Sequence, residues 1–304
     1  MSLTAASVIV RCRDEARNIE ACLRSLRAQT VGTEIVLVDS GSTDATVELA
    51  RPLCDRIVHL PSQEFSFGRA LNLGVRHAQG EILFALSAHC VAPDTGWVER
   101  SLVHYRDQSV AGVSGAARLP DGQLLDKARS ATFDDVRADP HWGFSNHASS
   151  WRRSAWEVVP FRETAKSCED KLWMWTVMLA GWKVVLDPRV VVSSEHRRAA
   201  GIRSLWRREV AEHAAVAAAL DFPLRTRGAL FWEWWDDFPW PSERPKWQRR
   251  LNPWRATELL AGALGDRLGA RRRGASTLSL PMTPCLPVEV GLPARHSAGS
   301  DARS

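Results

Sequence analysis

Short apolar runs alternate with amphipathic segments through the first third of the chain. The runs at 6–12, 34–39 and 81–87 are rich in β-branched or large apolar residues, as is typical of strands buried on both faces. Between them, the apolar residues of 18–29 fall on one helical face, and 67–78 is predicted to be a helix. Strands that alternate with helices at this spacing predict right-handed crossovers and a mostly parallel sheet covered on both faces.

The carboxyl ends of the predicted strands are where such a sheet binds ligands. These ends fall at residues 11–15, 39–44 and 87–90. A helix follows the second strand, and Ser42 or Thr43 is its expected N-cap. Candidate functional residues are therefore sought first in these three segments.

The second half of the chain is less regular. Residues 167–181 form the clearest predicted helix, with Ser167 as N-cap, acidic residues in the first turn and Gly181 at the end. Around it the sequence predicts a helix at 97–107, a strand at 110–119, a mixture of strand and helix at 144–161, and strands at 182–188 and 190–196.

From about residue 201 the chain becomes rich in arginine and tryptophan. The pattern predicts a helical extension over 201–274, whereas 275–304 lacks periodicity and has the composition of a disordered tail. Indoles together with arginines are typical of elements in peripheral contact with a membrane surface. The alternative is a helical subdomain that packs its tryptophans over a neighbouring site or a dimer partner.

Composition narrows the class of protein and its partners. The 304 residues are 45% hydrophobic and 25% charged, as expected for a water-soluble globular chain. No run of roughly 18 apolar residues occurs, so no membrane span is expected. Six cysteines without a CxxC pair indicate a reducing compartment, and the expected location is the cytoplasm. The net charge of +5 comes with positive residues that are nearly all arginine, which favours nucleic acid, lipid phosphate or a nucleotide-sugar diphosphate as a partner.

Five segments fall in the order and spacing of family 2 glycosyltransferases with the GT-A fold, and they look most like its rhamnosyltransferase-like bacterial members. The segments are SVIVRCRDEARNIEACLRSLRAQ, EIVLVDSGSTDAT, FSFGRALNLGVRHAQGEILFALS, FSNHASSWRRSAWE and EDKLWMWTVMLAGWKVVLDPRVVVSSEH. The resemblance implies an α/β, Rossmann-like GT-A catalytic domain over 1–200. It also implies inverting transfer of a hexose or deoxyhexose from a nucleoside-diphosphate sugar to the hydroxyl of a glycan, a lipid-linked or a small-molecule acceptor, and no nucleic-acid partner.

The resemblance places the nucleotide at the ends of the first two strands. Asp39 matches the acid that hydrogen-bonds the base or ribose, with Ser42 beside it; the alternative is that both only cap the next helix. Arg11, Arg13 and Glu15 lie in the segment that lines the nucleotide, where the two arginines reach the diphosphate or point to solvent.

Arg69 matches a position that approaches the nucleotide from a neighbouring loop. Its guanidinium would bind a uracil or thymine carbonyl or a phosphate oxygen, and the alternative is a solvated helix residue.

Asp170 is the candidate catalytic base. An acceptor hydroxyl must lose its proton as it attacks the anomeric carbon, and the family places that base in an acidic pair that matches Glu169 and Asp170. Glu169 would stabilise the helix start or orient the acceptor. The structural alternative is a capping box, in which Asp170 satisfies a backbone N–H together with Ser167.

Ser87, Ala88 and His89 stand where most relatives carry an acidic pair that binds Mg²⁺ or Mn²⁺. His89 falls on the ligand position, and His196 is a second candidate ligand. Imidazole accepts Mn²⁺ but is a poor ligand for Mg²⁺, and it supplies no negative charge. Three alternatives remain. The first is a metal held by these histidines and the diphosphate, and the second is a metal-free site in which protonated His89 acts with Arg69, Arg203, Arg207 or Arg208. The third is a site without activity, or a His89 that is only a buried structural residue.

Two other functions compete with glycosyl transfer. A nucleotidyltransferase of similar fold normally has a glycine-rich basic loop after the first strand, and RCRDEARN contains no glycine. A non-catalytic relative that binds nucleotide sugars would explain the missing acidic pair but not the retained Glu169 and Asp170. Trp142, Trp151 and Trp156 could stack on sugar rings, although core packing is the commoner role for tryptophan.

Overall fold

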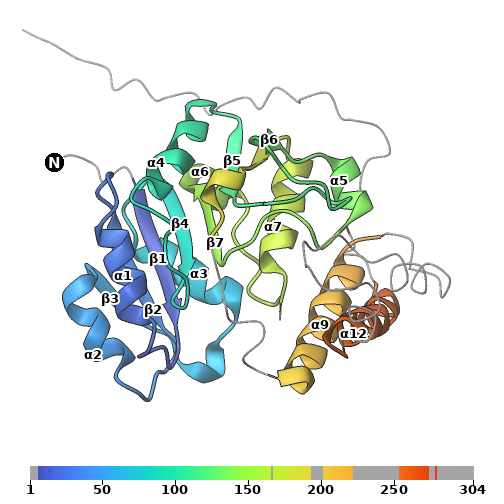
Figure 1. The fold of residues 1–304 in the computed structure, drawn as a ribbon, viewed down its shortest axis with the longest axis horizontal. Coiled ribbons are helices and arrows are strands. Elements are labelled where there is room, and N and C mark those ends of the chain that lie inside the picture. The colour runs from blue at the N-terminus through green and yellow to red at the C-terminus, as the bar shows by residue number, and fades with distance from the viewer. Residues whose placement is uncertain (1–5, 166, 193–200, 222–252, 274–277, 279–304) are drawn as a thin grey trace, which may run out of the picture.

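A mixed eight-stranded sheet forms the centre of the molecule. We describe it from a computed structural model that covers residues 6–165, 167–192, 201–221, 253–273 and 278 (Figure 1). The strand order is β3-β2-β1-β4-β7-β5-β8-β6. The strands are β1 (Ala6–Cys12), β2 (Glu34–Asp39), β3 (Arg56–His59), β4 (Ile82–Ser87), β5 (Val110–Ser114), β6 (Arg129–Ser130), β7 (Ala148–Arg152) and β8 (Lys183–Leu186).

The first four strands form a parallel half of the sheet, and three of them, β1, β2 and β4, were predicted from the sequence. β1 pairs with β2 and β4, and β2 pairs with β3, all in parallel. β7 runs antiparallel between β4 and β5, which makes the second half mixed. The register places Arg11 of β1 beside Ser87 of β4, and Cys12 opposite Asp39 of β2. Candidate residues from three strand ends therefore meet at one edge, as expected.

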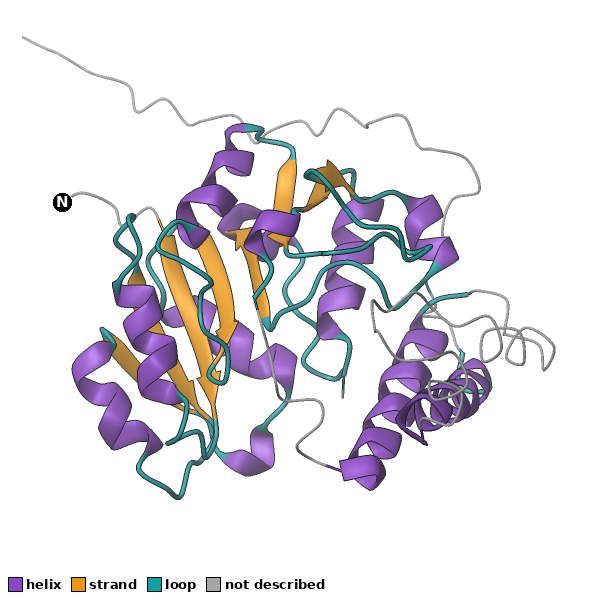
Figure 2. Cartoon of the chain, viewed as in Figure 1, coloured by secondary structure: helices purple, strands orange, loops and turns teal. Residues whose placement is uncertain are grey.

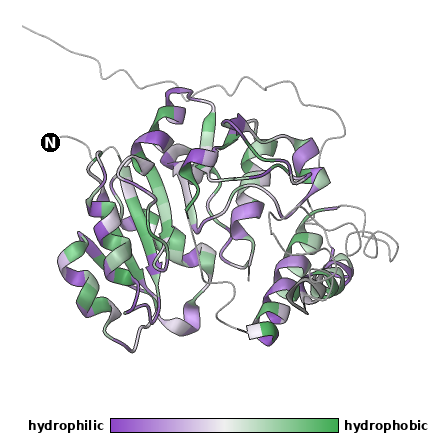
Figure 3. Ribbon diagram, viewed as in Figure 1, coloured by the Kyte–Doolittle hydropathy of each residue, from purple (hydrophilic) through white to green (hydrophobic). Residues whose placement is uncertain are grey.

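Helices cover both faces of the sheet, which confirms the predicted α/β class (Figure 2). Ile9 packs into the core with α3, whereas its neighbours Val8 and Val10 pack on the opposite face with α1. The central strands are mainly hydrophobic (Figure 3). The helices of this domain are α1 (Ile19–Arg27), α2 (Thr46–Ala50), α3 (Phe67–His77), α4 (Trp97–Leu102), α5 (Phe133–Ala138), α6 (Arg153–Val158) and α7 (Glu169–Leu179), with 3-10 turns at η1 (Arg51–Leu53), η2 (Ser62–Glu64), η3 (Val103–Arg106) and η4 (Pro188–Val190).

Two predicted helix caps are wrong. α2 begins at Thr46 with Ala45 as N-cap, because Ser42 and Thr43 are used in contacts between loops. α7 has Cys168 as N-cap in a left-handed conformation with φ 59°, and no side chain caps it. The Ser167 hydroxyl instead donates to the carbonyl of Ala211.

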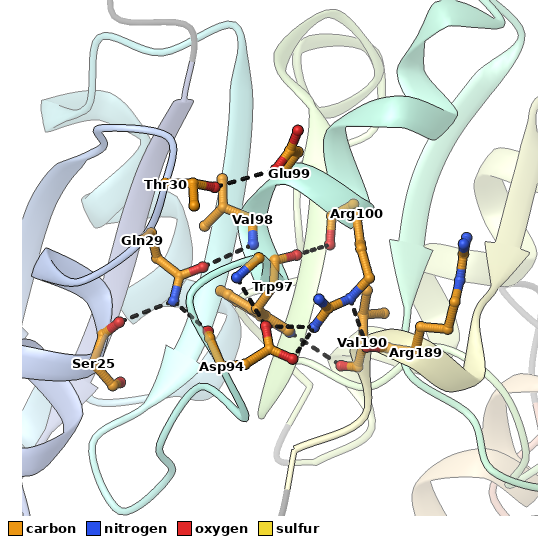
Figure 4. Close-up of polar contacts among 12 residues, drawn as sticks. Ser25, Gln29, Thr30, Asp94, Trp97, Val98, Glu99, Arg100, Arg189 and Val190 are labelled. Atoms are coloured by element: carbon orange, nitrogen blue, oxygen red, sulfur yellow. Dashed lines mark hydrogen bonds and ion pairs between the residues drawn. The ribbon is translucent and has the colours of Figure 1, made fainter.

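A polar network fixes the segment that leaves β4. The Gln29 amide donates to the Asp94 carbonyl at 2.8 Å and accepts from the Val98 N–H at 3.0 Å (Figure 4). Arg100 forms two bonds of 2.9 Å with the Asp94 carboxylate, and the Trp97 indole donates to the carbonyl of Val190. These bonds join α4 to η4 and to Gln29, just after α1, and so fix the segment that follows the turn carrying His89.

Two long helices, α9 (Gly201–Ala219) and α12 (Pro253–Ala270), lie within the predicted extension. They run in the same direction, since the contacts advance together from His213 with Asp266 to Asp221 with Arg273. A Cβ atom at Gly265 would lie 2.6 Å from the Val210 carbonyl oxygen, so glycine permits this close approach. The described part of the chain contains no helix with the length and apolarity of a membrane span. The Arg/Trp-rich stretch at 222–252 lies outside the described residues.

Candidate active site

Asp39 lies buried at the carboxyl end of β2, with 3% of its surface exposed. Its carboxylate accepts backbone N–H bonds from Gly41 at 3.3 Å and Ser42 at 3.1 Å, and His59 Nδ1 lies 3.3 Å away. Burial alone would raise the pKa of Asp39, but the hydrogen bonds from Ser42, His59 and Gly41 outweigh it and lower the pKa. The strand end therefore presents a stable carboxylate, which suits the nucleotide contact expected of it.

The loops after β1 and β2 are bonded to each other. The Asp14 N–H donates to the Ser42 hydroxyl at 3.0 Å, and the Asp14 carboxylate accepts from the Thr43 N–H at 2.7 Å. Asp14 has φ 52°, a conformation that aspartate tolerates better than most residues. The Glu15 N–H bonds the Thr46 hydroxyl at 2.7 Å. Ser42 thus holds the loop that carries Glu15.

His89 and Glu15 meet at this edge of the sheet. His89 Nδ1 lies 3.4 Å from Glu15 Oε1, and both side chains are mostly buried. The Ser87 backbone N–H donates to the carbonyl of His147, and the Ser87 carbonyl accepts from the Cys22 thiol. His89 supplies no negative charge, but the neighbouring Glu15 carboxylate does. Together the two side chains offer one nitrogen and one oxygen donor, a combination that suits Mn²⁺.

Arg11 connects the end of β1 to the start of α7. Its guanidinium donates to the Asn146 carbonyl at 2.8 Å and lies 3.5 Å from Glu169 Oε1, while it stands over the Phe67 ring at 5.3 Å. Arg11 therefore points into the protein, toward the acidic pair.

The candidate base is held by the same residues. The Asn146 N–H donates to Asp170 Oδ2 at 3.2 Å, and its side-chain amide donates to Glu169 Oε1 at 3.4 Å. Asp170 Oδ1 accepts the Lys171 N–H at 2.8 Å. Both oxygens of Asp170 have a fixed direction, and each retains a lone pair for an acceptor hydroxyl.

Burial dominates the electrostatics of this pair. It raises the pKa of Glu169 to about 7; the charge of Asp170 acts in the same direction, and Arg11 opposes it. Burial also lowers the pKa of Arg11, while Glu169 and Asp170 raise it. Glu169 therefore changes protonation near neutral pH, unlike the carboxylate of Asp39.

Arg13 and Arg69 have ionic contacts with acids outside the Arg11, Glu169 and Asp170 cluster. The Arg13 side chain is 57% exposed and lies 3.9 Å from the Asp14 carboxylate. Arg69 forms ion pairs with Glu64 at 3.0 Å and Glu163 at 3.2 Å.

The candidate arginines of α9 differ in their surroundings. Arg208 lies near two acids of its own helix, Glu209 and Glu212, while Arg203 and Arg207 are exposed on α9. His196 lies outside the described residues.

The three tryptophans named above have partners within the protein. Trp151 is fully buried in the core. The Trp142 indole donates to the Arg118 carbonyl at 2.7 Å, and the Trp156 indole donates to the Asn72 amide oxygen at 2.8 Å. These contacts are those of tryptophans that pack within the protein.

Asn146 and Asp14 are the residues that sequence reasoning missed. Asn146 lies in FSNHASSWRRSAWE, one of the five segments that carry the family resemblance, but it was not among the predicted site residues. Its contacts to Arg11 and to the acidic pair span 135 and 23–24 positions of the chain, and no local pattern reveals such partners. For Asp14, the polar run RDEARN was visible, but its left-handed backbone was not.

The strand ends that carry these residues fall within a stretch that matches a known protein family. Residues 7–163 match the family model described as Glycosyl transferase family 2. The chain belongs to this family. It is 34% identical over 109 residues to Glycosyltransferase AglE of Haloferax volcanii, an alignment that covers 33% of this chain and 35% of that protein. It is 27% identical over 192 residues to the O-antigen chain rhamnosyltransferase RfbN of Salmonella typhimurium, which covers 57% and 61%.

A solved structure of a mannosyltransferase shares the fold of this family 2 member. PcManGT from Pyrobaculum calidifontis, solved in complex with GDP-Man and Mn²⁺, superposes with a TM-score of 0.59 at 20% identity, covering 88% of this chain and 73% of that one. At this identity the likeness shows the fold, and the GT-A expectation is confirmed. The chain spans only 35% and 61% of the two relatives named above, so its own activity is inferred from the site.

Proposed function

We propose that this chain is an inverting glycosyltransferase, which moves a hexose or deoxyhexose from a nucleoside-diphosphate sugar to an acceptor hydroxyl. The observation that carries the proposal is the pairing of Arg11 with Glu169 and Asn146. It joins the strand edge where Asp39 lies to the start of α7, where Asp170 lies. A donor bound at the edge would therefore lie beside the candidate base. The membership of family 2, and a fold neighbour solved with GDP-Man and Mn²⁺, support a nucleotide-sugar donor.

Asp170 would act as the general base. Its oxygens are aimed by the N–H groups of Asn146 and Lys171. The acceptor oxygen attacks the anomeric carbon while its proton moves to Asp170. The bond from that carbon to the diphosphate breaks with inversion, and the nucleoside diphosphate leaves with the electron pair. A positioned base of this kind contributes on the order of 10²- to 10⁴-fold in rate.

Asp39 would hold the nucleotide, and Glu15 and His89 would face the diphosphate. The pair fits a divalent cation of the Mn²⁺ type, because it offers one imidazole and one carboxylate 3.4 Å apart. When bound, such an ion supplies positive charge to the leaving diphosphate. The chain's own contribution is the fixed position of the loop that carries Glu15, which the bonds at Asp14 and Thr46 hold in place.

A panel of UDP-, dTDP- and GDP-sugars, each with Mn²⁺, Mg²⁺ or EDTA, tests this proposal through nucleotide release and equilibrium binding. We expect one donor class to bind and to release nucleotide slowly, with Mn²⁺ the better cofactor. Absence of binding to every donor would refute the transferase. Full turnover in EDTA would refute a metal at His89 while leaving the transferase intact.

A further inference from the structure

Two histidines and an aspartate that have no role in the proposed transfer reaction lie close together. His141 lies in the loop after α5, His213 in α9 and Asp266 in α12. One ligand atom of each lies within 4.8 Å of those of the other two. Asp266 is 3% exposed, and both histidines are half-buried. Three segments separated by 72 and 53 positions thus bring nitrogen and oxygen donors to one point.

The contacts within this cluster are those of preorganised ligands. His213 Nδ1 lies 2.8 Å from Asp266 Oδ1, and its Nε2 lies 3.9 Å from Glu209 Oε2. The rings of His141 and His213 are 3.8 Å apart between centroids, at 34°. A divalent cation between these side chains would accept a lone pair from each ring and from the Asp266 carboxylate.

We propose that His141, His213 and Asp266 form a binding site for a transition-metal ion of the Zn²⁺ type. Two imidazoles and one carboxylate are a ligand set found for Zn²⁺, with bonds of about 2.0–2.2 Å, and a water would complete four ligands. The set suits Zn²⁺ better than Mg²⁺, which prefers oxygen ligands.

The helix packing explains how the donors are placed. A Cβ atom at Gly265 would lie 2.6 Å from His213 Cβ, so glycine at this position brings Asp266 beside His213. The His141 backbone N–H donates to Asp139 Oδ1 at 2.8 Å, which fixes the turn that presents its ring. The ion would therefore join two helices of the C-terminal extension to a loop of the GT-A domain.

The loop that carries His141 and helix α9 each contact residues next to the candidate base, Asp170. Asn146, which holds Asp170, follows His141 by five positions. On the other side, the Cys168 thiol lies 3.6 Å from the Glu212 carbonyl, next to His213, and Cys168 is the N-cap of the helix that carries Asp170. The metal would act as a structural link that steadies the acceptor side of the site, whereas the His89 and Glu15 pair faces the diphosphate.

Metal binding by the full chain without any nucleotide tests the proposal. Protein stripped with a chelator is dialysed against Zn²⁺ and its metal content is measured for wild type, His141→Gln, His213→Ala and His89→Ala. The matched control is His77→Ala, an exposed histidine at the end of α3. We expect His141→Gln and His213→Ala to lose about one Zn²⁺ per chain, with affinity lowered more than the roughly 10- to 100-fold that an outer contact costs. His77→Ala and His89→Ala should retain that ion.

His141→Gln is the variant that should keep the fold, because it leaves the contact between His213 and Asp266 intact. Its circular dichroism should match wild type, while the rise in thermal midpoint that Zn²⁺ gives wild type should disappear. Zn²⁺ content and thermal shift unchanged in both His141→Gln and His213→Ala would overturn the proposal. Because no donor is present, this result is independent of whether the transferase assay succeeds.

Discussion

Asp39 and Glu169 are both nearly buried carboxylates at the proposed active site, yet their surroundings have opposite effects. Backbone N–H groups and His59 surround Asp39, so hydrogen bonds outweigh burial and its pKa is lowered. Glu169 has an amide at 3.4 Å and Arg11 at 3.5 Å, and these do not compensate for burial, so its pKa is raised to about 7. Hydrogen-bond donors that compensate for burial lower the pKa of Asp39, whereas deeper burial and the neighbouring charge of Asp170 raise the pKa of Glu169.

The two carboxylates therefore lie in two regions that differ in how they are held together. The loops after β1 and β2 bond each other through short contacts and present a permanent charge to a ligand. The start of α7 is assembled from distant segments that share a few longer bonds, and its charge depends on pH and on its neighbours.

Asp170→Asn should have the largest effect. The amide keeps the size of the side chain but cannot take the acceptor proton, so kcat should fall by about 10²- to 10⁴-fold. Donor affinity, measured by equilibrium binding, should stay the same because Asp39 is untouched. Asp126→Asn, at an exposed loop position, is the control. Unchanged turnover in Asp170→Asn would remove it as the base.

Asp39→Asn should act on binding instead. Losing a charged hydrogen bond of about 1.5–3 kcal/mol should weaken donor binding roughly 10- to 100-fold. Because the acceptor side keeps its geometry, kcat at saturating donor should change far less than KM. Titration calorimetry with the nucleoside diphosphate checks the affinity, and a fall in kcat with constant affinity would place Asp39 outside the nucleotide site.

Glu169→Gln should abolish a pH dependence of stability. Between its ordinary pKa of 4.5 and about 7, folded Glu169 binds more protons than the unfolded chain does. The free energy of unfolding should therefore fall as pH rises through this window, by on the order of 1–3 kcal/mol. Urea denaturation at about pH 5 and about pH 8 should show a smaller fall in Glu169→Gln than in the control Glu157→Gln, an exposed residue. An equal fall in both variants would contradict the raised pKa.

Ser42→Ala should have the smallest effect. It removes the acceptor of the Asp14 N–H, in a loop that is partly exposed, and should lower the free energy of unfolding by about 0.5–1.5 kcal/mol. Ser130→Ala, at an exposed strand end, provides the matched comparison in the same denaturation experiment. A loss no greater than that of Ser130→Ala would show that the two loops are held by their other bonds.

The sequence by itself determined the parallel half of the sheet. Runs of β-branched or large apolar residues predicted β1, β2 and β4 at nearly their observed bounds, because a strand buried on both faces is mostly apolar. The same pattern located Asp39 and His89 at strand ends. β3 escaped it, since this short strand at the sheet edge is exposed at Arg56 and His59 and has no continuous apolar run. The two helix caps were predicted wrongly because serine and threonine can equally satisfy a neighbouring loop.

Only the tertiary structure decided what surrounds each candidate residue. Arg11 was expected at the diphosphate or in solvent, and it instead contacts Asn146 and Glu169 across 135 and 158 positions of the chain. The meeting of His141, His213 and Asp266 likewise depends on glycines that let two helices approach closely. Periodicity reports which face of an element is buried. The partner that covers this face, and hence the charge of a buried group, follows from packing between segments far apart in the chain.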